Sequence, residues 1–325
     1  MSRTALIVLV TLSSYCLLDL AISLVVAIVW RTRAVAPADL PPTVRARRLL
    51  QLRLVPGAAA AAITLLVVVP AFVIFEPPTA EEEIGPVLAL LASLAFLQLT
   101  VAAIAAGRSV WLTHRVAGEW LRTSRALGPQ QSAGLRAFAV ESPSPMVALV
   151  GVFNPTLIAS SSVINACTAG EIASIAGHER GHFESRDNLK RWIVASLPDM
   201  LRWTPVHREI VDAWHHAAED AADDATTGGE PIARAELAAL LLKVVRLAPA
   251  QSWNAAVVSP FVEQHGLERR VRRLLRPELE PPAPLAIVPL IALAAMATMI
   301  LAAISSPATL ERIFIALEHL VAFGR

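Results

Sequence analysis

The sequence predicts a mostly α-helical membrane protein with four transmembrane helices and one α+β domain outside the bilayer. Composition is the first indication, because 55 % of the 325 residues are hydrophobic and only 17 % are charged. The second is a set of four apolar stretches, each long enough to cross about 30 Å of hydrocarbon. The third is a more polar segment, 112–282, which is long enough to form a domain with its own core. The apolar stretches cover 4–30, 54–75, 86–107 and 283–305.

The first apolar stretch contains a single charged residue, Asp19. It is longer than the core of a signal peptide and has no clear small-residue cleavage site, so we expect it to remain as a span. A carboxylate is costly in hydrocarbon and needs a partner. Gln98 lies at a matching depth in the third stretch. We therefore expect a structural hydrogen bond between Asp19 and Gln98 rather than a proton relay.

The placement of arginines predicts the orientation, because segments that stay in the cytoplasm are enriched in Lys and Arg. The loop after the first stretch and both ends of 112–282 are basic, whereas the loop after the second stretch is acidic. The basic residues are Arg31, Arg33, Arg45, Arg47, Arg48, Arg53, Arg108, Arg115, Arg122, Arg125, Arg269, Arg270, Arg272, Arg273 and Arg276, and the acidic ones are Glu76, Glu81, Glu82 and Glu83. We expect the first loop and 108–282 on the cytoplasmic side of a bacterial inner membrane. The N-terminus, the second loop and 306–325 would lie outside.

The chain thus divides into four parts. Residues 1–111 hold three spans, 112–282 a cytoplasmic domain, 283–305 the fourth span and 306–325 a short external amphipathic tail. In the domain, an amphipathic part at 112–140 precedes two β-prone runs that a turn at Asn154-Pro155 separates. They predict a small β-hairpin or sheet, either as plain core or as an edge strand to which an extended peptide can add. The expected strands are 146–152 and 156–159, and the expected helices are 170–186, 187–197, 205–226, 231–247 and 260–275.

Several classes of function lack support in the sequence. Two cysteines cannot make a disulfide framework, and we interpret Cys16 and Cys167 as small buried hydrophobic residues. There is no CxxC pair, no glycine-rich phosphate loop and no serine nucleophile elbow. The arginine cluster at 269–276 adjoins a span, which favours contact with anionic lipid or a simple orientation signal over nucleic acid. The lipid bilayer is therefore an expected partner, and nucleic acid is not.

The pentapeptide His178-Glu179-Arg180-Gly181-His182 is the most informative about chemistry. It follows an apolar, helix-like run, and residues four apart lie on one face of a helix. Both imidazoles can therefore reach a single metal ion, as in the HExxH pattern. Glu179 lies beside them and can accept a proton from a water molecule that the ion activates. The pattern predicts a zinc-dependent peptidase in which His178 and His182 bind Zn²⁺.

A catalytic zinc ion usually has three protein ligands and one open position. The metzincin extension would require Gly at 185 and His at 188, where the chain has Ser185 and Asn188. Glu219 is the better candidate, because it lies in an alanine-rich segment that also predicts a helix. The sequence therefore favours a zinc site made by His178, His182 and Glu219.

Three further side chains are candidates for supporting roles. Asp223 shares a helix face with Glu219 and can accept a ring N–H from a zinc-bound histidine. His215 shares the same face, as a substitute ligand or as a donor to the transition state. Asp187 lies nine residues after His178, on the opposite side of a continuous helix. We therefore expect Asp187 to be an orienting or structural carboxylate rather than a ligand.

The stretch from His178 to Asp187, together with Glu219-Asp-Ala-Ala-Asp223, resembles the HExxH…RD…ExxxD pattern of the BlaR/MecR-type membrane zinc metallopeptidases. These are gluzincins related to HtpX and to CAAX-prenyl endopeptidases. The four-span topology is similar as well, and the resemblance covers about 1–305. It implies a zincin-like α+β domain in which His178, His182 and Glu219 are the zinc ligands and Glu179 is the catalytic base. The best-known members carry a large penicillin-binding sensor after the fourth span, where this sequence has only a short tail, so antibiotic sensing is not expected.

Together these patterns predict an integral-membrane zinc endopeptidase that cleaves a cytosolic or membrane-proximal protein in signal transduction or other regulated proteolysis. The resemblance makes a cytosolic transcriptional repressor one candidate substrate. Two alternatives stay open: a quality-control protease of the HtpX type, and a sensor or scaffold without catalysis. The presence of Glu179 argues against the scaffold, because a purely structural metal site does not need this base.

Overall fold

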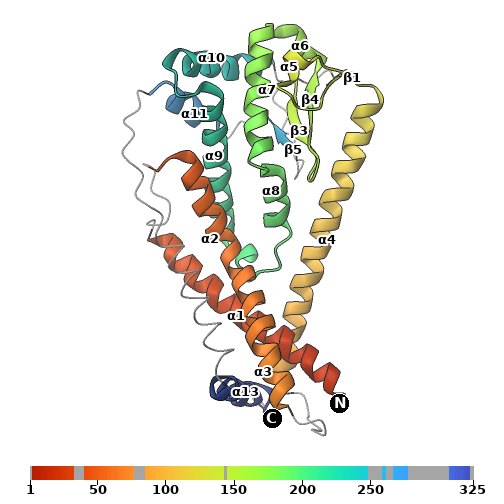
Figure 1. The fold of residues 1–325 in the computed structure, drawn as a ribbon, viewed down its shortest axis with the longest axis vertical. Coiled ribbons are helices and arrows are strands. Elements are labelled where there is room, and N and C mark those ends of the chain that lie inside the picture. Colours follow the sequence, from red (N-terminus) through yellow and green to blue (C-terminus); the bar gives the residue numbers. More distant parts are fainter. Residues whose placement is uncertain are drawn as a thin grey trace.

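The computed structural model describes residues 2–32, 40–76, 85–142, 145–247, 258–260, 266–276 and 307–322. Three helical columns form the lower part of the molecule (Figure 1). They are α1 (Arg3–Arg31), a second column made of α2 (Pro42–Ile63), the π-helical turn η1 (Thr64–Val68) and α3 (Val69–Phe75), and α4 (Pro86–Arg122). The remaining elements are β1 (Arg125–Ala126), α5 (Pro129–Ser132), β2 (Ala137–Val140), β3 (Val147–Val150), β4 (Thr156–Ser160), α6 (Ser161–Ala166), α7 (Ala169–Glu184), α8 (Asp187–Ala195), η2 (Met200–Trp203), α9 (Pro205–Thr227), α10 (Pro231–Leu247), β5 (Val258–Pro260), α11 (Leu267–Leu274) and α13 (Pro307–Ala322).

The three columns contain 29, 34 and 37 residues and have the length and apolar composition needed to cross a membrane. At a rise of about 1.5 Å per residue, each is longer than the hydrocarbon layer is thick. Three of the four expected spans are therefore present as apolar helices. The fourth, expected at 283–305, lies outside the described residues.

Two of these columns are longer than the sequence predicted. The second begins at Pro42 instead of 54, and α4 continues to Arg122 instead of ending at 107. The expected first loop was therefore wrong in part, since Arg45, Arg47, Arg48 and Arg53 lie on α2. This extension of α2 packs along α9, where Leu49 contacts Trp214 and Ala217. The second column is apolar enough to cross a membrane, and its first part also packs against α9, the helix that carries Glu219.

A five-stranded mixed sheet forms the β part of the domain, with the strand order β1-β2-β4-β3-β5. The expected hairpin is confirmed, because β3 pairs antiparallel with β4 and Leu149 lies opposite Leu157. The edge-strand interpretation of this hairpin was wrong. Strand β4 also pairs in parallel with β2, and β3 also pairs with β5, so both hairpin strands lie inside the sheet. Strands β1, β2 and β5 were not expected. Strands β1 and β5 contain only two and three residues, and β2 lies in the segment 112–140, for which only an amphipathic pattern was expected.

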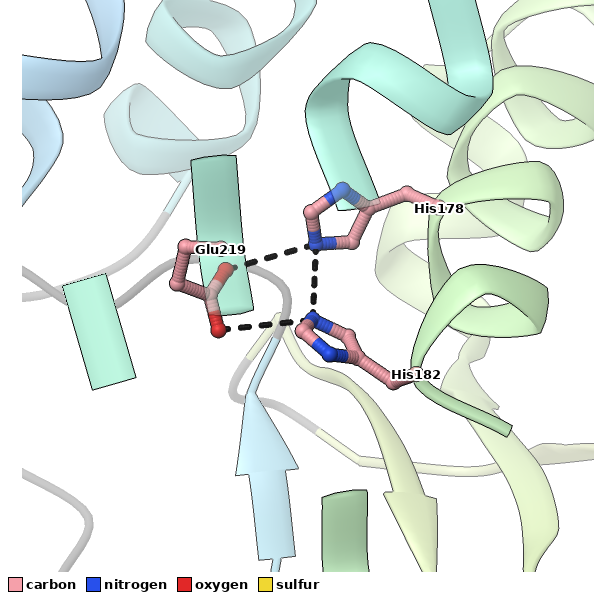
Figure 2. Close-up of side chains that lie close together, drawn as sticks. All are labelled: His178, His182 and Glu219. Atoms are coloured by element: carbon pink, nitrogen blue, oxygen red, sulfur yellow. Dashed lines mark hydrogen bonds and ion pairs between the residues drawn. The ribbon is translucent and has the colours of Figure 1, made fainter. Parts of the chain in front are cut away.

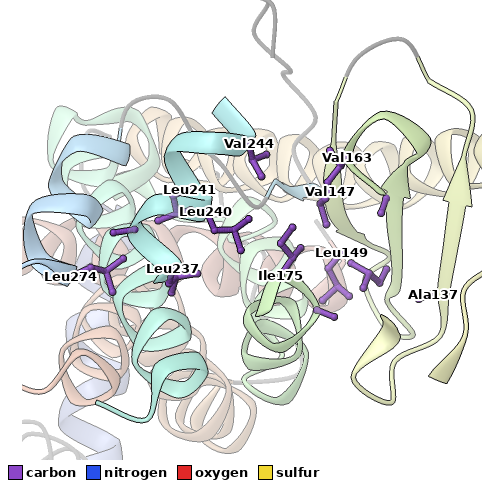
Figure 3. Packing of buried hydrophobic residues seen from close by; sticks show 14 residues of the cluster. Ala137, Val147, Leu149, Val163, Ile175, Leu237, Leu240, Leu241, Val244 and Leu274 are labelled. Atoms are coloured by element: carbon purple, nitrogen blue, oxygen red, sulfur yellow. The ribbon is translucent and has the colours of Figure 1, made fainter. Parts of the chain in front are cut away.

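Helices cover both faces of the sheet, because successive side chains of a strand point to opposite faces. Val147, Leu149 and Leu157 pack with residues of α6, α7, α10 and α11 in the main core (Figure 3). Val150 and Ile158 face the other way and contact Ala117 and Trp120 on the extension of α4. Burial on both faces explains why β3 and the middle of β4 are entirely apolar.

Most of the expected helices of the domain are confirmed, with small shifts at their ends. The helix that contains the HExxH residues runs over Ala169–Glu184, and the two longest helices that follow it are α9 and α10. The helix expected at 260–275 was wrong in its first part, because 258–260 forms β5 and α11 begins at Leu267. The amphipathic tail forms α13, which packs against the spans through a cluster that includes Phe72 and Phe314.

Buried polar contacts fasten the connection between α8 and α9 to the spans. Gln98 donates to Asp19 at 3.3 Å, as the sequence predicted. The backbone N–H of Met200 donates to the same Asp19 oxygen at 2.6 Å. Arg53 donates to Asp199 at 2.7 Å, with both side chains almost fully buried. The connection between α8 and α9 is therefore fixed to α1 and α2, and through Asp19 to α4.

Candidate metal centre

Helix α7 presents the HExxH residues on the side that faces α9. The helix begins with a capping box, in which Thr168 accepts from the backbone of Glu171 and the Glu171 side chain accepts from the backbone of Thr168. Such a box satisfies two N–H groups that a helix start leaves without partners. Ten residues later the helix reaches His178, Glu179 and His182, which are all buried.

Glycine at position 181 allows α7 and α9 to approach closely. A Cβ atom at Gly181 would lie 3.3 Å from the Cα of Ala222 and 3.4 Å from its Cβ. These separations are tighter than ordinary van der Waals contact, so a side chain there would push the helices apart. The close approach lets Glu219, one turn before Ala222 on α9, reach the two histidines of α7.

The three candidate ligands converge on one point (Figure 2). Nε2 of His178 lies 3.2 Å from Nε2 of His182. Oxygens of Glu219 lie 3.4 Å from Nε2 of His178 and 3.3 Å from Nε2 of His182. Two ligand atoms that are each about 2.0–2.1 Å from a tetrahedral zinc ion lie about 3.3 Å apart. The spacing and the donor set of two imidazoles and one carboxylate therefore fit zinc.

The other ring nitrogen of each histidine faces a buried carboxylate. Nδ1 of His182 lies 2.8 Å from Asp187, and Nδ1 of His178 lies 3.1 Å from Asp223. A carboxylate in this position favours the tautomer that carries its proton on Nδ1 and leaves a lone pair on Nε2. Both lone pairs then point at the same place, which is where a cation would bind.

Asp187 reaches His182 because the chain turns sharply after α7. Helix α7 ends at Glu184, and Arg186 has a left-handed backbone conformation with φ of 55°. The expectation that Asp187 lies on the opposite side was therefore wrong, because it assumed one continuous helix. The next residue, Asn188, donates to the carbonyl oxygens of Leu149 and Gly151 and so attaches α8 to β3.

The charges around the site stabilise a cation at the Nε2 atoms. Burial lowers the pKa of His182, but the charge of Glu219 and a hydrogen bond to Asp187 outweigh it and raise the pKa to about 10. Without a metal ion the ring therefore holds a second proton on Nε2, and a metal ion would take the place of that proton. Burial likewise raises the pKa of Glu219, but the charges of His182 and Arg270 hold it well below its usual range. Glu219 is therefore ionised and available as an anionic ligand.

Glu179 is the buried carboxylate next to the ligands that has no ligand position of its own. Its side chain is 0 % exposed. Neither of its oxygens has a hydrogen-bond partner among the described residues. Burial raises its pKa, although the nearby histidines counteract this. A carboxylate without partners and with a raised pKa is suited to accept a proton.

His215 lies on α9, one turn before Glu219, and its ring packs against Trp214 with 4.9 Å between the ring centroids. It does not belong to the group of three side chains whose donor atoms converge. Burial and the charge of Arg191 lower its pKa to about 3, so the ring is neutral. A neutral ring can bind a metal ion, so it is the position of its nitrogens, and not their protonation, that leaves His215 outside this group.

Two arginines near the site were not identified from the sequence. Arg270 of α11 lies 3.0 Å from Glu219 and donates twice to Asp223. Arg191 of α8 lies 3.6 Å from Glu219. Arg269, Arg270 and Arg273 bind acidic residues of α9. The expected contact of cluster 269–276 with anionic lipid was therefore wrong for these three arginines, whereas its role as an orientation signal stays a prediction. The only signal in the sequence was the pairing of an acidic helix with a later basic one.

Helices α7 and α9 thus bring two histidines and a glutamate together beside a small mixed sheet, in a group that could hold a metal ion. Residues 113–261 match the family model described as Peptidase family M48. The match includes α7, α8, α9 and α10, and so all the candidate ligands. It supports the broader family of membrane-associated zinc metallopeptidases that the resemblance implied. No curated protein matches the chain.

Proposed function

We propose that this protein is an integral-membrane zinc endopeptidase that cleaves a cytosolic or membrane-proximal protein. The observation that carries the proposal is the convergence of His178, His182 and Glu219 with the unpartnered carboxylate of Glu179 beside them. The match to a metallopeptidase family supports the peptidase activity, and the three apolar helices support a position in the membrane.

In this proposal His178, His182 and Glu219 hold the metal ion, and Asp223 and Asp187 keep the two imidazoles in the required tautomer. When bound, zinc would lower the pKa of a water molecule and polarise the scissile carbonyl group. Glu179 accepts the proton from the attacking water and passes it to the leaving amine. Burial raises the pKa of Glu179, which strengthens it as a base.

Removal of the metal ion should abolish peptide cleavage reversibly. We expect the purified protein in detergent to cut internal bonds of a peptide mixture, as read by mass spectrometry. A zinc chelator should stop the cleavage and added zinc should restore it, because the site has no substitute for the ion. Cleavage that continues in the metal-free protein would refute a zinc-dependent mechanism. Products trimmed only from their ends would refute an endopeptidase.

The orientation of the domain determines the compartment of the substrate. We propose that the domain is cytoplasmic, because the extensions of α2 and α4 toward it carry the arginines that the positive-inside rule retains. Helix α13 lies at the opposite end of the columns, beside the N-terminus (Figure 1). It would then face the outside.

Cysteine labelling in intact cells tests this orientation. Ala235 of α10 and Ala316 of α13 are both exposed. In a background with Cys167→Ser, an impermeant thiol reagent should label Ala316→Cys and leave Ala235→Cys unlabelled until the cells are opened. The reverse pattern would place the domain outside and would exclude a cytosolic substrate.

Two classes of substrate are compatible with a membrane endopeptidase of this kind. Regulated cleavage of a cytosolic protein, such as a transcriptional repressor, is our preferred role, because the BlaR/MecR-type resemblance implies it. Membrane-protein quality control of the HtpX type is the alternative. A repressor substrate predicts one major cut in one soluble protein, whereas quality control predicts many cuts in damaged membrane proteins.

A further inference from the structure

Arg270 contacts the candidate metal centre from α11, a helix that contributes no ligand. Its side chain is 2 % exposed, although it lies in the basic cluster 269–276. Nε and Nη2 donate to the two oxygens of Asp223 at 3.0 and 2.6 Å. Nη1 lies 3.0 Å from Oε2 of Glu219. One planar guanidinium group therefore contacts two carboxylates that lie one turn apart on α9.

The two carboxylates have different roles in the proposed site. Glu219 is the third ligand, and Asp223 faces Nδ1 of His178 at 3.1 Å. A change in either side chain would alter the donor atoms that the ion meets. We propose that Arg270 is a positioning residue of the metal centre, which sets metal affinity and donor geometry by holding Glu219 and Asp223 in place. This inference rests on the proposed function.

Electrostatics explains why a cation is needed at this position. Two buried carboxylates close together repel each other, and such repulsion favours protonation of one of them. Arg270 supplies the opposing charge through its contacts with both Asp223 and Glu219. A lysine has no planar fork and acts as a point charge, so it could not make both sets of contacts equally well.

Neighbouring arginines of α11 provide matched controls. Arg273 donates to Asp224 at 2.6 Å and so helps to attach α11 to α9. Asp224 is not among the side chains that converge on the metal site. Arg272 is 70 % exposed and pairs with Glu268 of its own helix. Substitution of Arg273 tests the attachment of α11 to α9, and substitution of Arg272 tests the loss of a surface charge. Only substitution of Arg270 removes the contact with Glu219 and Asp223.

The test compares the full-length parent with Arg270→Gln, Arg270→Lys, Arg272→Gln and Arg273→Gln in detergent. Zinc affinity is measured by competition with a chromophoric chelator, and donor geometry by the visible spectrum of the cobalt-substituted protein. Loss of a side chain that orients a ligand typically weakens metal binding about 10–100-fold. We expect this loss and an altered cobalt spectrum for Arg270→Gln, an intermediate effect for Arg270→Lys, and values like those of the parent for Arg272→Gln and Arg273→Gln.

Thermal unfolding of the metal-free proteins shows whether each variant is folded. If Arg270→Gln does not fold, the milder Arg270→Lys variant decides the question through its cobalt spectrum. Parent-like zinc affinity and cobalt spectra in the folded Arg270 variants would overturn the inference. An equal loss in Arg273→Gln would overturn it too, because α11 as a whole would then be responsible. A parent that binds no zinc would instead refute the proposed metal centre.

Discussion

Glu179→Gln should slow peptide cleavage by several orders of magnitude while leaving one zinc ion bound per chain. Glutamine keeps the size of the side chain but cannot accept the proton from the attacking water. A general base usually contributes about 10²–10⁴-fold to the rate, so we expect a loss in that range. Glu179 has no ligand position, and the donor atoms of His178, His182 and Glu219 remain. Cleavage of a peptide mixture and zinc content should be measured on the same preparation.

Glu184→Gln is the matched control for this variant. Glu184 lies on the same helix, but its side chain is 59 % exposed and pairs with Arg180. Its substitution should leave both cleavage and zinc unchanged. If Glu179→Gln cleaves as fast as the parent, the proposed base is wrong. If Glu179→Gln loses its zinc, the assignment of Glu179 as a base that does not bind the metal ion is wrong.

His178→Ala should remove the zinc ion and, with it, all cleavage. The substitution takes away one of three protein ligands and also leaves Asp223 without the imidazole that it faces. Zinc content of the purified protein, measured by mass spectrometry of the metal, should fall far below one ion per chain. Glu219→Ala should have the same effect, because Glu219 is the third donor.

Two other histidines test the specificity of that result. His319 on α13 is exposed and far from the site, so His319→Ala should keep its zinc. His215→Ala should keep zinc as well, because His215 is not among the converging donors. Loss of zinc in His215→Ala with retention in His178→Ala would exchange their roles and contradict the site described here.

The local part of the site could be predicted from the sequence because it depends on helical spacing. Four residues separate His178 from His182, and the same spacing separates Glu219 from Asp223. The position of Asp187 could not be predicted by counting along a helix, because Arg186 adopts a left-handed conformation that turns the chain. The conformation of this single residue places the Asp187 carboxylate next to His182, where a continuous helix would have placed it on the opposite side.

Long-range contacts explain the remaining differences. Arg270 lies 47 residues after Asp223 in the chain, and nothing in the local pattern distinguishes it from Arg272 on the surface. The arginine-rich first part of α2 was expected to be a loop, because charged residues usually mark the end of a membrane span. It is helical instead, and it packs on α9. Strand β2 was missed because four apolar residues carry no periodic signal.

The most direct test of the central claim is X-ray absorption spectroscopy at the zinc edge of the purified parent protein. We predict one zinc ion per chain with nitrogen and oxygen neighbours at about 2.0–2.2 Å, including the outer-shell scattering of two imidazole rings. The Glu179→Gln variant should give the same two-imidazole signal. Sulfur neighbours at about 2.3 Å, a single imidazole, or no bound zinc in the folded parent would contradict a centre built from His178, His182 and Glu219.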